Sequence, residues 1–483
     1  MNRLWLVVIV LAAASGALWA QDTEGEPSDG QQETVSVEEV TVIDAETAVQ
    51  LALANNLGVQ SRDIDLRKSK RLVDNAWTVF IPQVNATGSL SRVNQVQDIS
   101  GLAPVPDPGL VTPGNLAVQP FEQEGNRWNV STELSAGLSV NLQIIRNIQQ
   151  TVQQYDIGVI NLQDAKAQLR RDVRKQFYEL LSQQENIRIT RESIETARER
   201  FEQTQINYDN GLVDEFTLLS ARVQLENLRP QLQQQQLGYR NALMGFKQTL
   251  GLPPAEPIEL NGQIEADLIS LEADALIKDY VDRRYDIQLA RQGITSAELA
   301  LDAKRAERYP TLSLSWRADP SFAGDPFEDP WFDDIDNDWN QRSGAFAISI
   351  TQPLDPLLPF SRTQVEIDNL KDDVQKARIQ LEQARTGAEI RIRQLVDQLE
   401  TSRNAIEVRR LNVERARRAF NLAQEAYDAG NRELLEVREA EDELQQAQVQ
   451  LLDEQKNYVV ALLDLVYAVN TSIEDLRERS NGE

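Results

Sequence analysis

Residues 173–208 read VRKQFYELLSQQENIRITRESIETARERFEQTQINY, and residues 392–427 read IRQLVDQLETSRNAIEVRRLNVERARRAFNLAQEAY. In each stretch every seventh residue is apolar or aromatic, six times in succession, and the two series are offset by 219 residues. The series are Val173, Leu180, Ile187, Ile194, Phe201 and Tyr208, then Ile392, Leu399, Ile406, Val413, Phe420 and Tyr427. A strict seven-residue period predicts a helix that coils around a neighbour along one apolar seam. Ordinary amphipathic helices, the alternative interpretation, would drift from this period.

The same offset predicts a two-fold internal repeat. It relates Gly211 to Gly430 and Leu225 to Leu444. We expect a first structural repeat over 41–255, a second over 256–470 and a C-terminal tail over 471–483.

Each repeat is expected to contain a long helix that ends at a hairpin tip. Helical periodicity runs over about 143–210 and 360–429, which corresponds to rods of about 100 Å. Both end at Tyr-x-x-Gly, which predicts that Gly211 and Gly430 are left-handed C-caps. Return helices are expected over about 213–250 and 432–469, and shorter helical segments over 59–80 and 287–308.

Four short stretches have a period of two instead, over about 83–91, 133–143, 311–317 and 344–352. An apolar face opposite a polar face fits a membrane barrel, with lipid outside and water within, and it fits a half-buried soluble sheet equally well. Strand lengths close to a membrane span and two long polar loops, over about 92–130 and 318–342, favour the barrel. We interpret the acidic run in the second loop as solvated rather than as a cation site.

Four strands cannot seal a pore, because open strand edges are not tolerated in hydrocarbon and the smallest barrels have about eight strands. Several chains must therefore pool their strands. The sequence itself permits two or three copies.

The composition excludes several functions. The chain has 49 Lys and Arg against 76 Asp and Glu, a formal charge of −27, which argues against nucleic acid as a partner. It contains no Cys and no His, so thiolate or imidazole catalysis and His or Cys metal sites are excluded. We expect no catalytic residue, no metal and no cofactor. A glycosidase with paired carboxylates is the remaining enzyme alternative, but no acidic pair converges on a pocket.

The N-terminal residues predict export from the cytoplasm. Residues 1–20 have the order of a signal peptide, with Arg3, an apolar run over 4–11 and a small-residue end at Ala20. Residues 21–40 are acidic and read as a flexible lead-in. No later segment has about 18 consecutive apolar residues, so the sequence predicts no membrane-spanning helix after residue 20.

Several motifs together resemble the TolC-type outer-membrane efflux protein family, over essentially the whole chain after the signal. They are AETAVQLALANN (45–56), Pro82 and Pro310 before two strands, YDNGLVDEFTLLSARVQL (208–225), GFKQTLGLP (245–253) and YDAGNRELLEVREAEDEL (427–444). The resemblance implies an α+β, mainly α fold. In a homotrimer, four membrane strands per chain form a 12-stranded barrel, and long coiled-coil helices form an α-barrel tunnel in the periplasm.

The implied function is a passive export duct in the outer membrane, part of a tripartite efflux or type I secretion system. Its implied partners are two further copies of itself, a periplasmic adaptor protein, an inner-membrane transporter and outer-membrane lipid. The alternatives are a periplasmic adaptor, which would need compact β modules around a single hairpin, and a surface coiled-coil structural protein, which would not need apolar strand faces.

The resemblance also implies a gate at the hairpin tips. Tyr427 and Arg432 match residues that tie the inner helix pair to its neighbours, and Glu436 and Glu439 match carboxylates that ring the constriction and select cations. Arg432, Glu436 and Glu439 share a helix face by their spacing. The position expected to hold an aspartate partner for Arg432 is Thr217, a departure that leaves Asp214 or Glu215 as substitutes.

The hairpin tips have a second implied role. Gly211, Gly430, Leu212 and Val213 are expected to close the tips and to contact the adaptor.

Overall fold

A computed structural model describes residues 41–93, 127–324, 344–429 and 431–482. Val42–Glu483 forms one compact unit, and the fold below is that of its described residues. The expected signal peptide, the lead-in, Gly430 and most of both strand-connecting loops lie outside the described residues.

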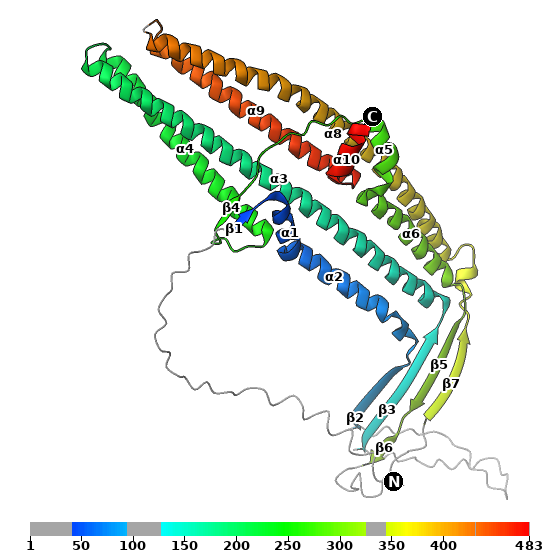
Figure 1. Ribbon diagram of the computed structural model, residues 1–483. Coiled ribbons are helices and arrows are strands. Elements are labelled where there is room, and N and C mark those ends of the chain that lie inside the picture. The colour runs from blue at the N-terminus through cyan, green and yellow to red at the C-terminus, as the bar shows by residue number, and fades with distance from the viewer. Residues whose placement is uncertain (1–40, 94–126, 325–343, 430, 483) are drawn as a thin grey trace, which may run out of the picture. The chain divides into compact units, whose positions relative to one another are not determined.

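Two long hairpins dominate the unit (Figure 1). α3 (Leu142–Asp209) is followed by α4 (Glu215–Leu250), and α8 (Arg362–Asp428) is followed by α9 (Leu434–Val469). The long helices have 68 and 67 residues and the return helices 36 each, so the two hairpins match in length.

Shorter helices complete the length of each return helix. α1 (Ala45–Asn55) and α2 (Leu57–Asp74) precede the long strands of the first repeat, and α5 (Ala273–Tyr280) and α6 (Tyr285–Ala306) precede those of the second. α3 contacts α4 and α2 on one side and α9 and α6 on the other, and α8 contacts α9 and α6. The helices therefore form a layer four wide, in the order α4/α2, α3, α9/α6, α8 (Figure 1).

A five-stranded antiparallel sheet follows at one end of the helical layer (Figure 1). Its order is β2 (Gln83–Val93), β3 (Arg127–Val140), β5 (Thr311–Ala318), β7 (Gly344–Thr351), and β6 (Ser321–Gly324) also pairs with β3. β6 continues the register of β5, because Leu134 pairs with Ala318 and Ser131 with Ser321. β5 and β6 therefore form one strand line, interrupted around Pro320, which has no N–H to donate.

The strands differ from the predicted ranges at their ends. β3 starts at Arg127 rather than 133, and it ends at Val140 rather than 143 because the Asn141 side chain accepts a hydrogen bond from the Ile144 N–H (3.0 Å) and caps α3. Residues 318 and 321–324, predicted as loop, are strand because they pair with β3. Alternation alone shows neither where a cap begins nor how far a partner strand extends.

The register places the apolar residues of neighbouring strands on one face of the sheet. Val140 pairs with Leu312 and Leu312 with Ile350, and nearer the strand centres Leu138 pairs with Leu314. This face is largely uncovered within the chain, since Val84, Phe346 and Ile350 are each about two thirds exposed or more.

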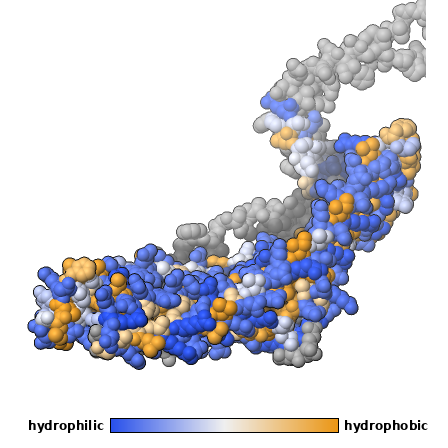
Figure 2. All heavy atoms as spheres, turned by 90° about the horizontal axis from the view of Figure 1, so that it is seen from above, coloured by the Kyte–Doolittle hydropathy of each residue, from blue (hydrophilic) through white to orange (hydrophobic). Residues whose placement is uncertain are grey.

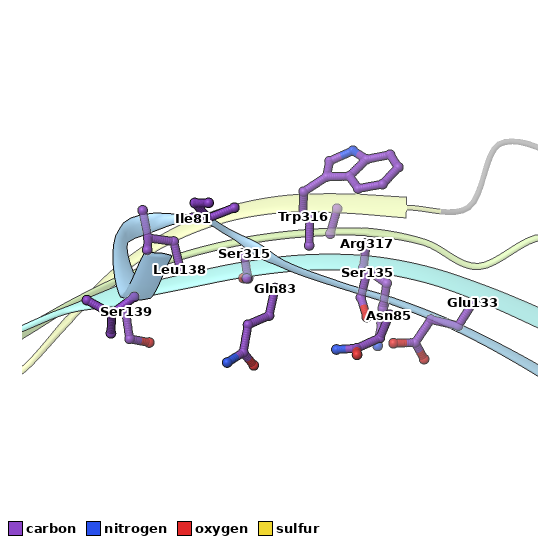
Figure 3. A pocket seen from close by; sticks show the side chains of 14 residues that line it. Ile81, Gln83, Asn85, Glu133, Ser135, Leu138, Ser139, Ser315, Trp316 and Arg317 are labelled. Atoms are coloured by element: carbon purple, nitrogen blue, oxygen red, sulfur yellow. The ribbon is translucent and has the colours of Figure 1, made fainter. Parts of the chain in front are cut away.

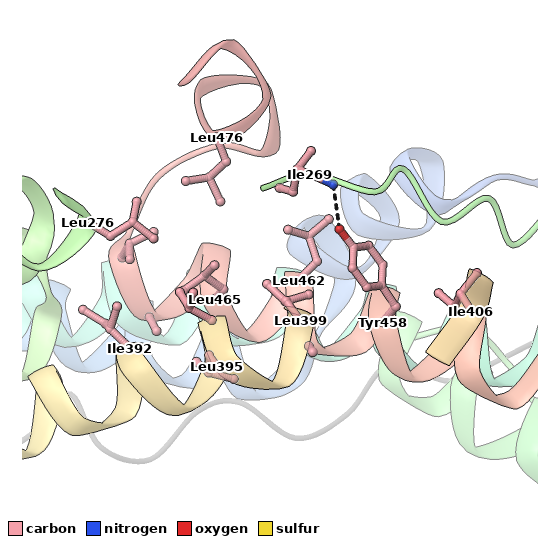
Figure 4. Packing of buried hydrophobic residues seen from close by; sticks show 14 residues of the cluster. Ile269, Leu276, Ile392, Leu395, Leu399, Ile406, Tyr458, Leu462, Leu465 and Leu476 are labelled. Atoms are coloured by element: carbon pink, nitrogen blue, oxygen red, sulfur yellow. Dashed lines mark hydrogen bonds between the residues drawn. The ribbon is translucent and has the colours of Figure 1, made fainter. Parts of the chain in front are cut away.

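The buried core lies where the hairpin bases meet the short helices. One cluster packs α1 against α3 and α4, around Phe177, Leu180 and Phe246. The other packs α8 and α9 against α5, α10 (Ile473–Gly482) and the connecting segment before α5 (Figure 4). In it the Tyr458 hydroxyl accepts a hydrogen bond from the Ile269 N–H (2.9 Å) and donates one to the Asp267 carbonyl (3.0 Å).

The predicted heptad seams are buried only at their base. Val173, Leu180 and Ile187 are buried, whereas Tyr208 at the tip is 38% exposed. Ile392, Leu399 and Ile406 are buried in the same way, and the later positions of that seam are only partly covered. Because each fully buried aliphatic side chain contributes about 1.5–3 kcal/mol, stability is concentrated at the base and decreases toward the tips.

Among the described helices, none carries a run long and apolar enough to cross a bilayer.

Candidate functional site: the hairpin tips and the polar face of the sheet

The first tip joins α3 to α4 through a tight left-handed turn. Gly211 has φ 71°, and the Leu212 N–H donates to the Asn207 carbonyl (2.8 Å), which closes the end of α3. Asp214 then caps α4, since its carboxylate accepts from the Thr217 N–H (2.9 Å) and the Thr217 hydroxyl (2.6 Å). The hydroxyl bond, followed by the N–H bond, lowers the pKa of Asp214.

Large apolar side chains cover the outside of this first tip. Leu212 is 73% exposed and Phe216 76% exposed, with further exposed side chains on the adjoining turns. These are Ile206, Leu219 and Val223. Val213 is half-buried between them.

The second tip has the same backbone closure and different chemistry. The Asn431 N–H donates to the Ala426 carbonyl (2.8 Å), the counterpart of the bond at Leu212. Glu433 begins α9 without a side-chain cap, and Arg432 forms an ion pair with Glu436 one turn later. Gly430 lies outside the described residues, so its expected cap geometry is a prediction.

The structure brings some predicted gate residues together and not others. Arg432 and Glu436 pair within one helix turn, and Glu439 lies exposed on the next turn. Tyr427 is half-buried, and within the described chain no hydrogen bond joins it or Arg432 to the first hairpin. Asp214, a suggested substitute partner for Arg432, already caps α4.

A buried ion pair joins the two hairpins instead. Arg200 of α3 donates through Nη1 to Oε2 of Glu441 on α9 (2.5 Å), and their side chains are 6% and 10% exposed. Burial raises the pKa of Glu441, and the adjacent guanidinium opposes that shift. The pair lies about 14 Å along α3 from the tip, where the apolar seam no longer covers the helices well. It therefore ties α3 to α9 close to the tips.

Sequence reasoning missed this pair, although the repeat contains a signal. The residue 219 positions after Arg200 is Ala419, and the residue 219 positions before Glu441 is Arg222. The two halves of the repeat therefore carry different residues at both positions. These are the positions at which the first hairpin contacts the second.

The polar face of the sheet forms the second part of the site. A hollow of about 580 Å³ lies against this face and includes Gln83, Asn85, Glu133, Ser135, Ser315 and Arg317 in its lining. Figure 3 shows Gln83, Asn85 and Glu133 on one side of the sheet and Trp316 on the other. Serine hydroxyls also meet across strands on this face, Ser89 with Ser131 (2.7 Å) and Ser139 with Ser313 (3.2 Å).

Hydrophobic side chains on the surface gather at the end of the helical layer with the tips and around the sheet (Figure 2). Between them the surface is mostly hydrophilic (Figure 2). Within the described residues, no group of three or more acidic side chains is arranged to hold a metal ion.

A sheet with one exposed apolar face and one polar face, continued by a layer of long helices, fits a membrane channel subunit. The sequence model of the family described as "Outer membrane efflux protein" matches residues 48–252 and 276–471. The chain belongs to this family.

Individual relatives agree with this assignment. The chain is 21% identical to the outer membrane protein TolC of Salmonella enteritidis over 439 residues, 89% of this chain and 83% of that protein. It is 22% identical to nodulation protein T of Rhizobium leguminosarum bv. viciae over 374 residues, 75% and 74% of the two chains.

A solved structure agrees on the fold. The fold matches crystal structures of CusC, reported for transmembrane channel formation, with a TM-score of 0.69 at 18% identity, covering 93% and 99% of the chains. The predicted family, the mainly helical fold and the outer-membrane location are thereby confirmed. The protein is an outer-membrane efflux duct with a periplasmic helical part, and its family is one of transport ducts rather than enzymes.

Proposed function

We propose that three copies of this chain assemble around one axis into a passive, continuous export duct. The observation that carries this proposal is the unfinished sheet. β2 pairs only with β3 and β7 only with β5 among the described strands, so both outer edges offer unpaired backbone groups beside a lipid-facing surface. Three copies with four strand lines each would close a 12-stranded barrel.

The helical layer supports ring closure. Exposed apolar side chains follow its two opposite edges. On α8 they are Val365, Ile379, Ile390, Val408, Leu411 and Leu422, and on α2 and α4 they are Leu57, Ile64, Leu72, Leu219, Val223, Leu237 and Met244. Two different edges that cover each other make a head-to-tail interface, which closes into a ring when the rotation permits.

Cross-linking between strand edges tests the number of copies. The chain has no native cysteine, so a thiol pair at Thr87→Cys on β2 and Ser349→Cys on β7 reports only on these edges. With a short bifunctional thiol reagent we expect covalent species that end at three chains. The matched control is Ser139→Cys with Ser313→Cys, neighbours within one chain, which should give monomer alone. Products that end at two chains would refute the three-copy duct.

The gate is proposed at the tips, where Tyr427, Arg432, Glu436 and Glu439 surround the axis and the Arg200–Glu441 tie holds the hairpins together. The cluster around Gly211, Leu212 and Val213 is the proposed main contact for a periplasmic adaptor that links the duct to an inner-membrane transporter, and Gly430 of the second tip is a lesser contact. The half-exposed Arg432–Glu436 pair supports the gate, and the exposed apolar side chains of the first tip support the adaptor contact.

Single-channel recording in planar bilayers tests the gate. Neutralising Arg432 is expected to increase the small resting conductance, and Glu436→Gln with Glu439→Gln is expected to reduce cation preference severalfold, since a carboxylate ring raises the local cation concentration. Glu382→Gln with Glu400→Gln, exposed on α8 far from the tip, removes the same charge as a control. Unchanged conductance and selectivity in the tip variants would refute the gate but not the duct.

A further inference from the structure

One stretch of α8 is basic in a chain that is strongly acidic overall. Residues 403–418 contain six arginines and two glutamates, although the whole chain has a formal charge of −27. The counterpart stretch of the first hairpin, residues 184–199, contains three arginines and four glutamates. The two stretches therefore have net charges of +4 and −1, and the positive excess lies on the second hairpin.

Three of these arginines follow one another at seven-residue spacing, about 10 Å apart along the helix. We call them the arginine line, and they are Arg403, Arg410 and Arg417. Each lies four residues after a position of the apolar seam. In a coiled coil that position carries the charges that select the partner helix.

The arginine line begins where the covered base of the hairpin ends. Val396, seven residues before Arg403, is buried in the core cluster that includes residues of α5 and α10. Figure 1 shows α5 and α10 beside the base of this hairpin, while α8 and α9 extend beyond them to the tip. The arginine line therefore continues the covered face of α8 into a part of the helix that α5 and α10 do not cover.

Among the residues that the structure describes, none of the three guanidinium groups forms an ion pair or a hydrogen bond. Neighbouring arginines do have partners, since Arg409 lies 4.0 Å from Glu454 of α9 and Arg418 pairs with Glu414. Arg410 and Arg417 are exposed, and Arg403 is half-buried. The cations of the arginine line are thus available to another molecule.

A neighbouring copy of the chain does not offer the complementary charge. The exposed apolar edge of α8, which includes Val408, Leu411 and Leu422, lies about a third of a turn around the helix from the arginine line. At the opposite edge of the layer, α2 has five basic residues against three acidic ones, and α4 has four against two. The complementary surface therefore belongs to a different molecule.

We propose that an acidic helix of a second periplasmic protein docks lengthwise on α8, with carboxylates at seven-residue spacing opposite the arginine line. Seven residues advance both helices by the same distance, so the three ion pairs form in register. Val413 and Phe420, three residues after Arg410 and Arg417, are only half-buried and share their side of the helix. A docked helix covers these side chains and adds apolar burial to the charge pairing.

Binding of a synthetic peptide to the purified full chain tests this surface. The probe is a stapled helix of three heptads with one glutamate in each heptad, followed by fluorescence anisotropy. Exchanging all three residues of the arginine line for glutamine should weaken binding about tenfold, the combined effect of three exposed ion pairs. A peptide of the same composition with its glutamates five residues apart should bind as weakly to wild type, because those carboxylates point to different sides.

A charge exchange sharpens the test. Arg403→Glu with Arg410→Glu and Arg417→Glu should bind the peptide in which lysine replaces each glutamate, and should lose the glutamate peptide. The matched control is Arg188→Gln with Arg191→Gln and Arg198→Gln, which removes three arginines from the counterpart stretch. It should leave binding unchanged, since Arg188 and Arg198 already pair with glutamates of their own helix.

A carboxylated cell-wall polymer is the other class of acidic partner. Neither the seven-residue spacing nor the half-buried apolar side chains fits it, so isolated peptidoglycan should not displace the peptide. Displacement by peptidoglycan, binding that ignores the glutamate spacing, or an equal loss in the control variant would each overturn the proposal. The surface lies within one chain and goes beyond the proposed duct and gate. Because cross-linking reports the copy number separately, a failure here leaves the duct proposal unaffected.

Discussion

The two hairpin tips share a backbone and differ in chemistry. In both, a backbone N–H donates to the carbonyl five positions earlier. The bond runs from Leu212 to Asn207 in the first tip and from Asn431 to Ala426 in the second. At the position where the first tip exposes Leu212, the second has Asn431, and where the first has Thr217 the second has Glu436.

We propose that this difference separates two tasks within one repeated unit. An apolar, rigidly capped tip suits a protein contact, because burying exposed apolar surface is the main favourable term in association. A charged tip without a side-chain cap suits a constriction, because its carboxylates act on ions and its ion pair is reversible. In this proposal the repeat supplies the geometry, and the substitutions between its halves supply the functions.

The largest effect is expected from breaking the tie between the hairpins. Arg200→Ala leaves Glu441 buried without its partner, a change that costs about 3–5 kcal/mol in comparable pairs, and should free α9 from α3 near the tip. We expect a much larger resting conductance in planar bilayers. Arg198→Ala, an exposed arginine on the same helix paired with Glu202, is the control and should behave as wild type. Equal conductance in the two variants would rule out a gating role for the buried pair.

The second prediction concerns which tip meets another protein. A photo-crosslinking amino acid at Leu212 should form adducts in cells with a periplasmic adaptor, identified by mass spectrometry, because this position is 73% exposed in an apolar cluster. The same amino acid at Asn431, the counterpart position, should form far fewer such adducts. Adaptor adducts of equal yield at both tips would contradict the division of tasks.

The third prediction uses pH to distinguish the two kinds of carboxylate. Because burial raises the pKa of Glu441, and the Thr217 hydroxyl and N–H lower the pKa of Asp214, acidification should protonate Glu441 at a higher pH than Asp214. Because its pKa is raised, Glu441 holds a proton more tightly in the buried, tied form than it would in an opened, hydrated form. Acidification should therefore favour the tied hairpins, and conductance should fall on acidification in wild type.

The variant Glu441→Gln provides the control for this pH effect. Its conductance should not respond to pH in the same range. A wild-type response that persists in Glu441→Gln would assign the effect to another group.

The smallest effect is expected from the caps themselves. Asp214→Ala removes the oxygen that accepts from the Thr217 N–H, so amide hydrogen exchange at Thr217 should accelerate. Since the Asp214 pKa is depressed in the folded chain, the capping contribution exists above its unfolded pKa and is lost as pH falls through the folded pKa. Glu433, the counterpart of Asp214 at the second tip, makes no side-chain cap. Glu433→Ala should therefore change amide hydrogen exchange at the start of α9 little. Equal acceleration at both tips would show that capping does not distinguish them.

Much of the fold could be predicted from local pattern. The heptad series predicted α3 and α8 to within a few residues, because helix formation depends on side chains three and four positions apart. Alternation predicted where β2, β3, β5 and β7 lie, because neighbouring side chains in a strand point to opposite faces. The predicted strand ends were less accurate, because they depend on contacts with other residues. Asn141 caps α3, and β6 extends the line of β5 by pairing with β3.

The candidate site could be predicted only in part. The tip positions Gly211, Arg432, Glu436 and Glu439 followed from the repeat and the family resemblance, whereas the partner of Arg432 did not. Arg432, just before α9, pairs with Glu436 in the first turn of that helix, and Asp214 of the first hairpin caps α4 instead.

The amino-acid sequence by itself therefore determined the repeated hairpins, the two-faced strands and the unfinished sheet, because each is set by periodicities that span a few residues. Only the tertiary structure decided that Arg200 meets Glu441, 241 positions away, and that Arg409 meets Glu454 of α9 while Arg410 beside it stays unpaired in the described part of the chain. Those contacts depend on which helices and strands become neighbours and in which register. That choice results from packing summed over the whole unit.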